Sequence, residues 1–156
     1  MGRKKKSIQR DLTPDPRFHS ELVARFINNS MVAGEKNVAE RMFYQAMDIV
    51  EERSGQEPLE VFQKALENVK PFLEVRSRRV GGATYQIPVE VSQDRRTALA
   101  IRWILSFSRA RKGIPFSQKL AAELMDAYQN QGAAVKKKQN THKMAEANKA
   151  FAHYKW

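Results

Sequence analysis

The chain has 156 residues, of which 42% are hydrophobic, enough for one globular domain with a buried core. It contains no cysteine, which excludes disulfide bonds, cysteine-ligated metal sites and thiol catalysis. Its 28 basic and 17 acidic residues give a net charge of +11, which points to a polyanionic partner, either nucleic acid or an anionic membrane surface.

The charge is unevenly distributed along the chain. Residues 1–10 hold 5 basic and no acidic residues, whereas residues 11–70 hold 7 basic and 11 acidic ones. Residues 95–112 hold 6 basic and no acidic residues, and residues 113–156 hold 7 and 3. Segregation of this kind produces an electrostatic field with a direction, unlike the scattered charge of a protein that happens to be basic.

The first ten residues, MGRKKKSIQR, are too polar to pack in a core, and we expect a basic arm over residues 1–12 that is disordered until it meets a partner. A single helical domain is expected over residues 13–156. In the sequence TPDP, Asp15 is a good N-cap and Pro16 suits the first helical position, which predicts a helix over about 16–29. Its apolar positions are Phe18, Leu22, Val23, Phe26 and Ile27.

Two further helices are predicted before the middle of the chain. The run from Glu35 to Ser54 carries a broad apolar stripe and is followed by Gly55, a typical helix stop. Pro58 then opens a shorter helix that Pro71 closes. The expected inward residues are Val38, Met42, Ala46, Ile49 and Val50 in the first of these helices, and Phe62, Leu66 and Val69 in the second.

Residues 72–91 predict a β-hairpin with Gly81 and Gly82 as the two residues of a primed turn. This register places Pro88 in a non-hydrogen-bonded pair, where its missing N–H is not needed; a longer loop is the alternative. Arg78 then shares one side of the ribbon with the Tyr85 ring. The predicted pairs are Val80 with Ala83, Arg78 with Tyr85, Arg76 with Ile87 and Val75 with Pro88.

Three helices are predicted after the hairpin, which makes the fold mainly α: a bundle of about six helices with a protruding β-hairpin arm. Ser92 caps a helix over about 93–108, and a second helix runs from Ser117 to about Asn130. We expect NQGAAVKKKQN to be a loop and Thr141 to cap the last helix. The inward residues are Ala98, Ile101 and Leu105, then Leu120, Ala121, Leu124 and Tyr128, then Met144, Ala147 and Phe151.

Arginines on both sides of the hairpin are not explained by folding, because a lone two-stranded ribbon is marginal in water. Guanidinium groups suit phosphates in bidentate geometry. Together with the other basic segments, they favour a nucleic-acid-binding arm over a solvated surface hairpin. Trp103 lies in the all-basic segment and is either a core residue or a stacking platform; aromatic residues on helices usually pack, which favours the core.

Other classes of function find less support. The three histidines lack paired-ligand spacing, and no phosphate-binding loop or nucleophile elbow is present, so we expect no catalytic residues, metal or cofactor. A nonspecific, chromatin-like DNA-binding protein is the alternative, supported by charge alone. A membrane-surface protein would need a larger continuous apolar face on its last helix. A nuclease would need a carboxylate cluster for its metal ions.

Three segments together carry a family resemblance: the hairpin EVRSRRVGGATYQIPVEV, the run GQEPLEVFQKALENVKP and the tail AVKKKQNTHKMAEANKAFAHYKW. Over essentially the whole chain they resemble the universal seventh-protein family of the small ribosomal subunit, in its bacterial form. The resemblance implies a cytoplasmic, non-enzymatic protein that binds the 3′ major domain of small-subunit rRNA and nucleates assembly of the subunit head. It also implies a position near the exit-site tRNA and the mRNA, beside small-subunit proteins nine and eleven, with no membrane partner.

The resemblance and the charge segments together assign the candidate binding residues. The rRNA-binding residues are Arg3, Lys4, Lys5, Lys6, Arg10, Lys36, Arg76, Arg78, Arg79, Arg95, Arg96, Arg102, Arg109, Arg111, Lys112, Lys136, Lys137 and Lys138. The residues on the tRNA and mRNA side are Arg79, Gly81, Gly82, Ala83, Thr84, Lys143 and Lys149. Asn29 and Glu35 depart from the family pattern, which favours basic residues there. Gln139 and Asn140 stand where acids are common, which strengthens the positive field.

Overall fold

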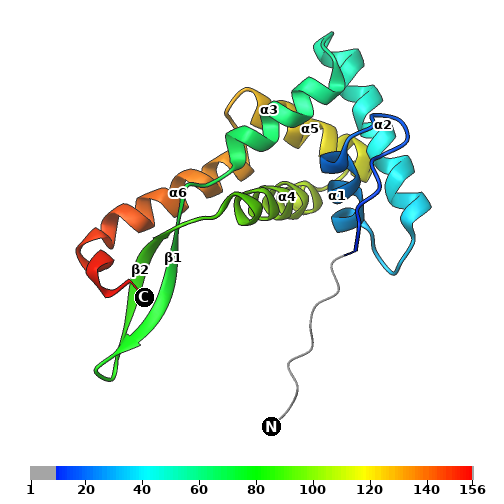
Figure 1. Ribbon diagram of the computed structural model, residues 1–156. Coiled ribbons are helices and arrows are strands. Elements are labelled where there is room, and N and C mark those ends of the chain that lie inside the picture. Colours follow the sequence, from blue (N-terminus) through cyan, green and yellow to red (C-terminus); the bar gives the residue numbers. More distant parts are fainter. Residues whose placement is uncertain (1–9, 156) are drawn as a thin grey trace.

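The computed structural model describes residues 10–155, which form six α-helices, a 3₁₀-helix and a β-hairpin (Figure 1). The predicted mainly α fold with a hairpin arm is therefore confirmed. The prediction of a disordered tail falls largely on residues 1–9, which lie outside the described residues. In chain order the elements are α1 (Glu21–Ser30), α2 (Lys36–Ser54), α3 (Pro58–Val69), β1 (Leu73–Val80), β2 (Ala83–Glu90), α4 (Gln93–Ala110), α5 (Phe116–Tyr128), α6 (Ala133–Ala147) and η1 (Lys149–Tyr154).

Helix α5 is central to the bundle, because it packs against α2, α3 and α4. Helix α6 leaves the bundle on the side of the hairpin and packs on β1, and η1 packs on β2 (Figure 1). The hairpin thus projects from the bundle with the C-terminal elements along one side of it.

Three phenylalanine rings, from α1, α2 and α3, form the centre of one half of the core. The ring centroids of Phe26 and Phe43 lie 5.5 Å apart, those of Phe26 and Phe62 5.2 Å, and those of Phe43 and Phe62 5.4 Å. Such tilted and edge-to-face pairs add to the free energy of burying the rings. The core continues through Ile101 and Ile104 of α4 to Leu120 and Leu124 of α5, and Trp103 packs half-buried against it, as predicted.

The first helix begins later than predicted, because Asp15 caps a separate short turn. Asp15 Oδ2 accepts hydrogen bonds from the backbone N–H groups of Arg17 (3.1 Å) and Phe18 (2.9 Å). His19 then adopts a left-handed conformation (φ 50°), which interrupts the helical path. Ser20 is the actual N-cap of α1, and its hydroxyl accepts from the backbone N–H of Val23 (3.4 Å).

The inward faces of α3 and α5 match the prediction, with Phe62, Leu66, Val69, Leu120, Ala121 and Leu124 buried. On α2, Ala46 and Val50 are buried as predicted, but Ala39 and Phe43 are buried in place of the predicted Val38 and Met42, because the Phe43 ring packs against those of Phe26 and Phe62. On α4, Ile101 and Leu105 are buried as predicted, but Ala98 is exposed. On α2 the buried residues are Ala39, Phe43, Ala46, Met47 and Val50, whereas Val38, Met42 and Ile49 are half-buried.

The predicted loop over residues 130–140 is wrong, since α6 begins at Ala133. Gly132 has φ 92°, and a Cβ there would lie 2.9 Å from Asp126 Cβ, so the chain passes tightly against α5. The buried carboxylate of Glu123 accepts a hydrogen bond from the backbone N–H of Ala134 (3.1 Å). The cap of α6 therefore comes from a neighbouring helix and leaves no signal in the adjacent sequence.

The predicted cap at Thr141 is also wrong, because α6 begins eight residues earlier, at Ala133. Thr141 lies inside α6, where its hydroxyl donates to the carbonyl oxygen of Lys137 (2.8 Å). The face of α6 that packs inward consists of Ala134, Val135 and Ala145, whereas Met144 is 55% exposed and Ala147 is exposed. Phe151 belongs to η1 rather than to this helix.

The hairpin has the predicted register, with Val80 opposite Ala83, Arg78 opposite Tyr85, Arg76 opposite Ile87 and Val75 opposite Pro88. Gly81 (φ 58°) and Gly82 (φ 86°) both adopt the positive φ that a type I′ turn requires. The alternative of a longer loop is excluded.

Candidate nucleic-acid interface

The hairpin presents its arginines in two ways. Arg76 and Arg79 are exposed on β1, as are the tip residues Gly81 to Thr84. Arg78 is half-buried, and its Nη1 donates a hydrogen bond to the carbonyl oxygen of Tyr154. The exposed arginines and the open tip are accessible to a partner from several directions.

Glu74 organises the base of the hairpin. Its buried carboxylate accepts hydrogen bonds from Arg76 Nε (2.9 Å) and, in bidentate geometry, from Arg95 Nε (2.8 Å) and Nη2 (2.9 Å). Burial of the Glu74 carboxyl opposes ionisation, but the hydrogen bonds and positive charges of Arg95 and Arg76 outweigh it and hold the pKa of Glu74 below its ordinary value. Glu74 thus links the hairpin to α4 and orients two guanidinium groups that remain partly exposed.

Three arginines of α4 continue this positive surface along the bundle. Arg95, Arg102 and Arg109 are spaced seven residues apart, so they follow one side of the helix with a drift of about 20° per step. At a rise of 1.5 Å per residue, the row is about 21 Å long. It starts at the Glu74 contact and ends beside α1, where Arg109 Nη2 donates to the carbonyl oxygen of Ser30 (2.9 Å).

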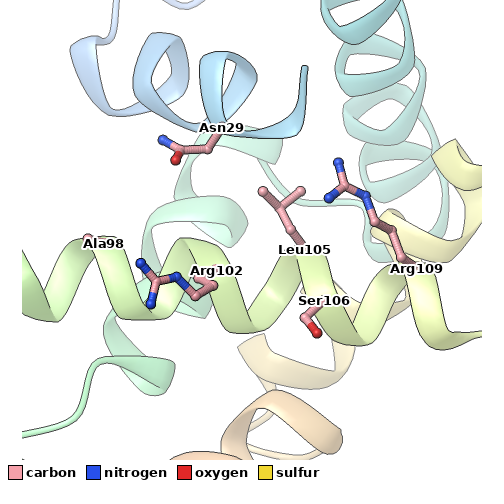
Figure 2. Close-up of a pocket in the computed structure, with 6 residues that line it drawn as sticks. All are labelled: Asn29, Ala98, Arg102, Leu105, Ser106 and Arg109. Atoms are coloured by element: carbon pink, nitrogen blue, oxygen red, sulfur yellow. The ribbon is translucent and has the colours of Figure 1, made fainter. Parts of the chain in front are cut away.

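A pocket of about 430 Å³ lies between α1 and α4 in this row. Figure 2 shows the Arg109 side chain reaching from α4 toward α1, the Arg102 side chain extended along α4, and Asn29 above them on α1. Arg102 has no hydrogen-bond or ion-pair partner among residues 10–155, and no acidic side chain lines the pocket. A concave site with two guanidinium groups, an amide and the hydroxyl of Ser106 has the chemistry to hold a phosphate group.

A second group of basic residues meets where the hairpin joins α4 and α6. The guanidinium carbon of Arg96 lies 4.2 Å from the centroid of the Phe72 ring, and Arg96 Nε donates to the carbonyl oxygen of Pro71 (3.1 Å). Lys138 Nζ donates to the carbonyl oxygen of Asn68 (2.9 Å). Burial, and then the positive charge of Arg96, lowers the pKa of Lys138. Arg96 and Lys138 therefore stabilise this junction as well as contributing charge.

His142 belongs to the same junction. Its Nε2 accepts a hydrogen bond from the backbone N–H of Phe72 (3.0 Å), which requires that this nitrogen carry no proton. Burial, together with the charge of Lys138, lowers the pKa of His142 and so favours the neutral form that the hydrogen bond needs.

Not every predicted binding residue faces outward. Arg111 donates from Nε (3.0 Å) and Nη2 (2.8 Å) to Glu123 and from Nη2 to Asp126 (2.5 Å), so its guanidinium group is engaged inside the fold. The predicted residues that are exposed are Arg10, Lys36, Arg76, Arg79, Arg95, Arg102, Arg109, Lys112, Lys136, Lys137, Lys143 and Lys149. Arg3, Lys4, Lys5 and Lys6 lie outside the described residues.

Sequence reasoning missed Glu74 and Glu123. A signal for Glu74 was present, because residues two apart on a strand share a face, which places Glu74 beside Arg76. Glu123 gave no such signal, since its partners Arg111 and Ala134 come from other elements. The two positions that depart from the family pattern lie on the surface: Asn29 lines the α1–α4 pocket, and Glu35 is exposed at the start of α2.

A comparison with protein families places this arrangement in context. The sequence model described as "Ribosomal protein S7p/S5e" matches residues 2–149. The chain belongs to this family. Among curated proteins, the chain is 59% identical to small ribosomal subunit protein uS7 of Desulfotalea psychrophila, and 58% identical to the uS7 proteins of Desulfatibacillum aliphaticivorans and of Anaeromyxobacter sp. strain K. Each of these matches covers all of both chains.

The family assignment confirms the resemblance that the hairpin, the 55–71 run and the C-terminal tail indicated. Within residues 10–155, no group of three or more His, Asp or Glu side chains is arranged to hold a metal ion. No helix in the same described range is long and apolar enough to cross a membrane.

Proposed function

We propose that this chain is a structural protein of the small ribosomal subunit that binds ribosomal RNA through a continuous basic surface. The observation that carries this proposal is the row of arginines that begins on the hairpin, passes Glu74 onto α4 and ends at the α1–α4 pocket. Family membership indicates that the RNA is ribosomal, and the arginine row provides the groups that contact its phosphates.

Binding of this kind requires no chemical step. Phosphate contacts from the exposed arginines and lysines supply most of the affinity, and the shape of a folded RNA supplies selectivity. The hairpin is narrow enough to enter a groove or junction, while the α4 row follows the RNA backbone. The basic residues Arg3, Lys4, Lys5, Lys6 and Arg10 add further positive charge at the N-terminal end of the sequence.

We further propose the finer assignments that the family resemblance implies. The RNA is the 3′ major domain of small-subunit rRNA, and binding nucleates assembly of the subunit head in the cytoplasm. The hairpin tip, Arg79 to Thr84, together with Lys143 and Lys149, faces the exit-site tRNA and the mRNA. Small-subunit proteins nine and eleven are the protein neighbours.

The test is the salt dependence of binding to a fragment of the 3′ major domain RNA. Arg102→Ala removes one phosphate contact and is expected to lower the log–log salt slope by about one. Arg53, exposed on the last turn of α2 away from the basic row, provides the matched control, and Arg53→Ala is expected to leave the slope unchanged. Equal slopes for the wild type and Arg102→Ala would remove the pocket from the interface.

A further inference from the structure

The last structural element, η1, holds the middle of the hairpin through aromatic contacts. The Tyr85 ring centroid lies 5.2 Å from that of Phe151 and 5.1 Å from that of Tyr154. The rings of Phe151 and Tyr154 are stacked, with centroids 6.3 Å apart. Arg78, which faces Tyr85 across the strands, donates its hydrogen bond to the carbonyl oxygen of Tyr154. We call Tyr85, Phe151 and Tyr154 the arm cluster.

The hairpin needs such support, because a two-stranded ribbon has little stability of its own. Within β1 and β2 only Glu74 and Ile87 are buried, and both lie toward the base of the arm. From Ser77 to Gln86 every residue is exposed or half-buried. The arm cluster is therefore a tertiary contact between the hairpin's outer half and the C-terminal element η1.

The base of the arm is held separately by α6, where His142 accepts the hydrogen bond from Phe72. Only Asn148 separates α6 from η1, so the position of the arm cluster is tied to that of the helix. The hairpin is thus fixed at two points by one continuous C-terminal segment, and two points determine its direction relative to the bundle.

We propose that Phe151 and Tyr154 are positioning residues that fix the angle of the hairpin arm before RNA binds. This inference rests on the proposed function in its consequence for RNA binding. A ligand that meets an ordered arm avoids the entropic cost of ordering it, so the arm cluster increases affinity without touching RNA. The cluster leaves Arg76, Arg79 and the tip exposed. This arrangement is expected of a contact that supports the arm (a brace), whereas a contact that blocks RNA binding (a mask) would cover these residues.

The first experiment measures the arm angle in the free protein. Because the chain has no cysteine, Thr84→Cys at the tip and Gln63→Cys on α3 allow two spin labels at exposed positions of the full chain. We expect a narrow distance distribution by pulsed electron resonance, and one at least twice as broad after Phe151→Ala with Tyr154→Ala. Tyr154→Phe keeps the ring and is expected to keep the narrow distribution. An unchanged distribution in the double alanine variant overturns the proposal.

The second experiment measures affinity for the 3′ major domain fragment. Loss of two ring contacts is expected to weaken binding by about tenfold, with an unchanged salt slope because no phosphate contact is lost. Tyr154→Phe is expected to restore wild-type affinity. Unchanged or tighter binding by the double alanine variant overturns the proposal, and tighter binding would identify η1 as a mask. Failure of the wild-type protein to bind would refute the proposed function, and the spin-label distances would still test the brace.

Discussion

Among the polar side chains, Glu123 is the one whose removal we expect to lower the free energy of unfolding most. Its carboxylate accepts two hydrogen bonds from Arg111 and one from the backbone N–H of Ala134, and the side chain is 1% exposed. It therefore joins the end of α4 to α5 and caps α6. Glu123→Ala removes all three hydrogen bonds at once.

The cost can be worked out from these contacts. A hydrogen bond to a charged group contributes about 1.5–3 kcal/mol, and a buried N–H left without a partner costs about 1–3 kcal/mol. Arg111 keeps its ion pair with Asp126 (2.5 Å), and its side chain is 33% exposed. The free energy lost with its hydrogen bonds to Glu123 therefore lies near the lower end of the range for hydrogen bonds to charged groups. The free energy of unfolding should fall by about 3–4 kcal/mol.

Urea unfolding followed by circular dichroism measures this change. Glu52 on α2 is exposed and serves as the control, since Glu52→Ala should change the free energy of unfolding by no more than about 0.5 kcal/mol. Loss of α6 structure should accompany Glu123→Ala and appear as faster hydrogen exchange at residues 134–137. A change below about 1 kcal/mol would refute the argument that Glu123 caps α6 and anchors Arg111.

Three further predictions concern the core and two titrating groups. Phe43→Ala, which empties the centre of the aromatic core, should lower the free energy of unfolding by about 3–5 kcal/mol, and a loss under 1 kcal/mol would contradict the packing described. The pKa of His142 is lowered in the folded state, so His142 stabilises the fold above the ordinary histidine pKa of 6.5, and this stabilisation is lost as pH falls through 6.5 and below. The melting temperature of the wild type should therefore drop between pH 7.5 and 5.5. His142→Gln should make that drop smaller. The folded-state pKa of Glu74 is also lowered, so its contribution is present above pH 4.5 and lost as pH falls further; Glu74→Gln should reduce the acid sensitivity of the hairpin's amide exchange, and an unaltered profile would show that the Arg95 and Arg76 contacts contribute no stability.

Local signals sufficed for the hairpin and for α3. Two glycines at the turn, the alternation around them and the placement of Pro88 determined the register, because strand pairing next to a two-residue turn leaves no freedom. Prolines at both ends bounded α3. In these segments the information lies within a few residues of the structure that it specifies.

The start of α6 and the role of Arg111 could not be predicted in this way. Both depend on Glu123, which meets them only after α4, α5 and α6 have packed together. Arg102 and Arg111 are residues of the same type in the same basic segment, yet Arg102 lines an open pocket and Arg111 is engaged by the buried carboxylate of Glu123. The sequence identifies which segments carry positive charge, and the tertiary structure determines which of their basic side chains remain available to a ligand.

The central claim is that the basic row from the hairpin to the α1–α4 pocket binds structured ribosomal RNA. The most direct measurement is a salt titration of binding to the 3′ major domain fragment, with duplex DNA of equal length as competitor. The account predicts tight binding with a steep salt dependence that excess DNA does not abolish. Equal competition by DNA would contradict it, because the row would then act as a nonspecific polycation.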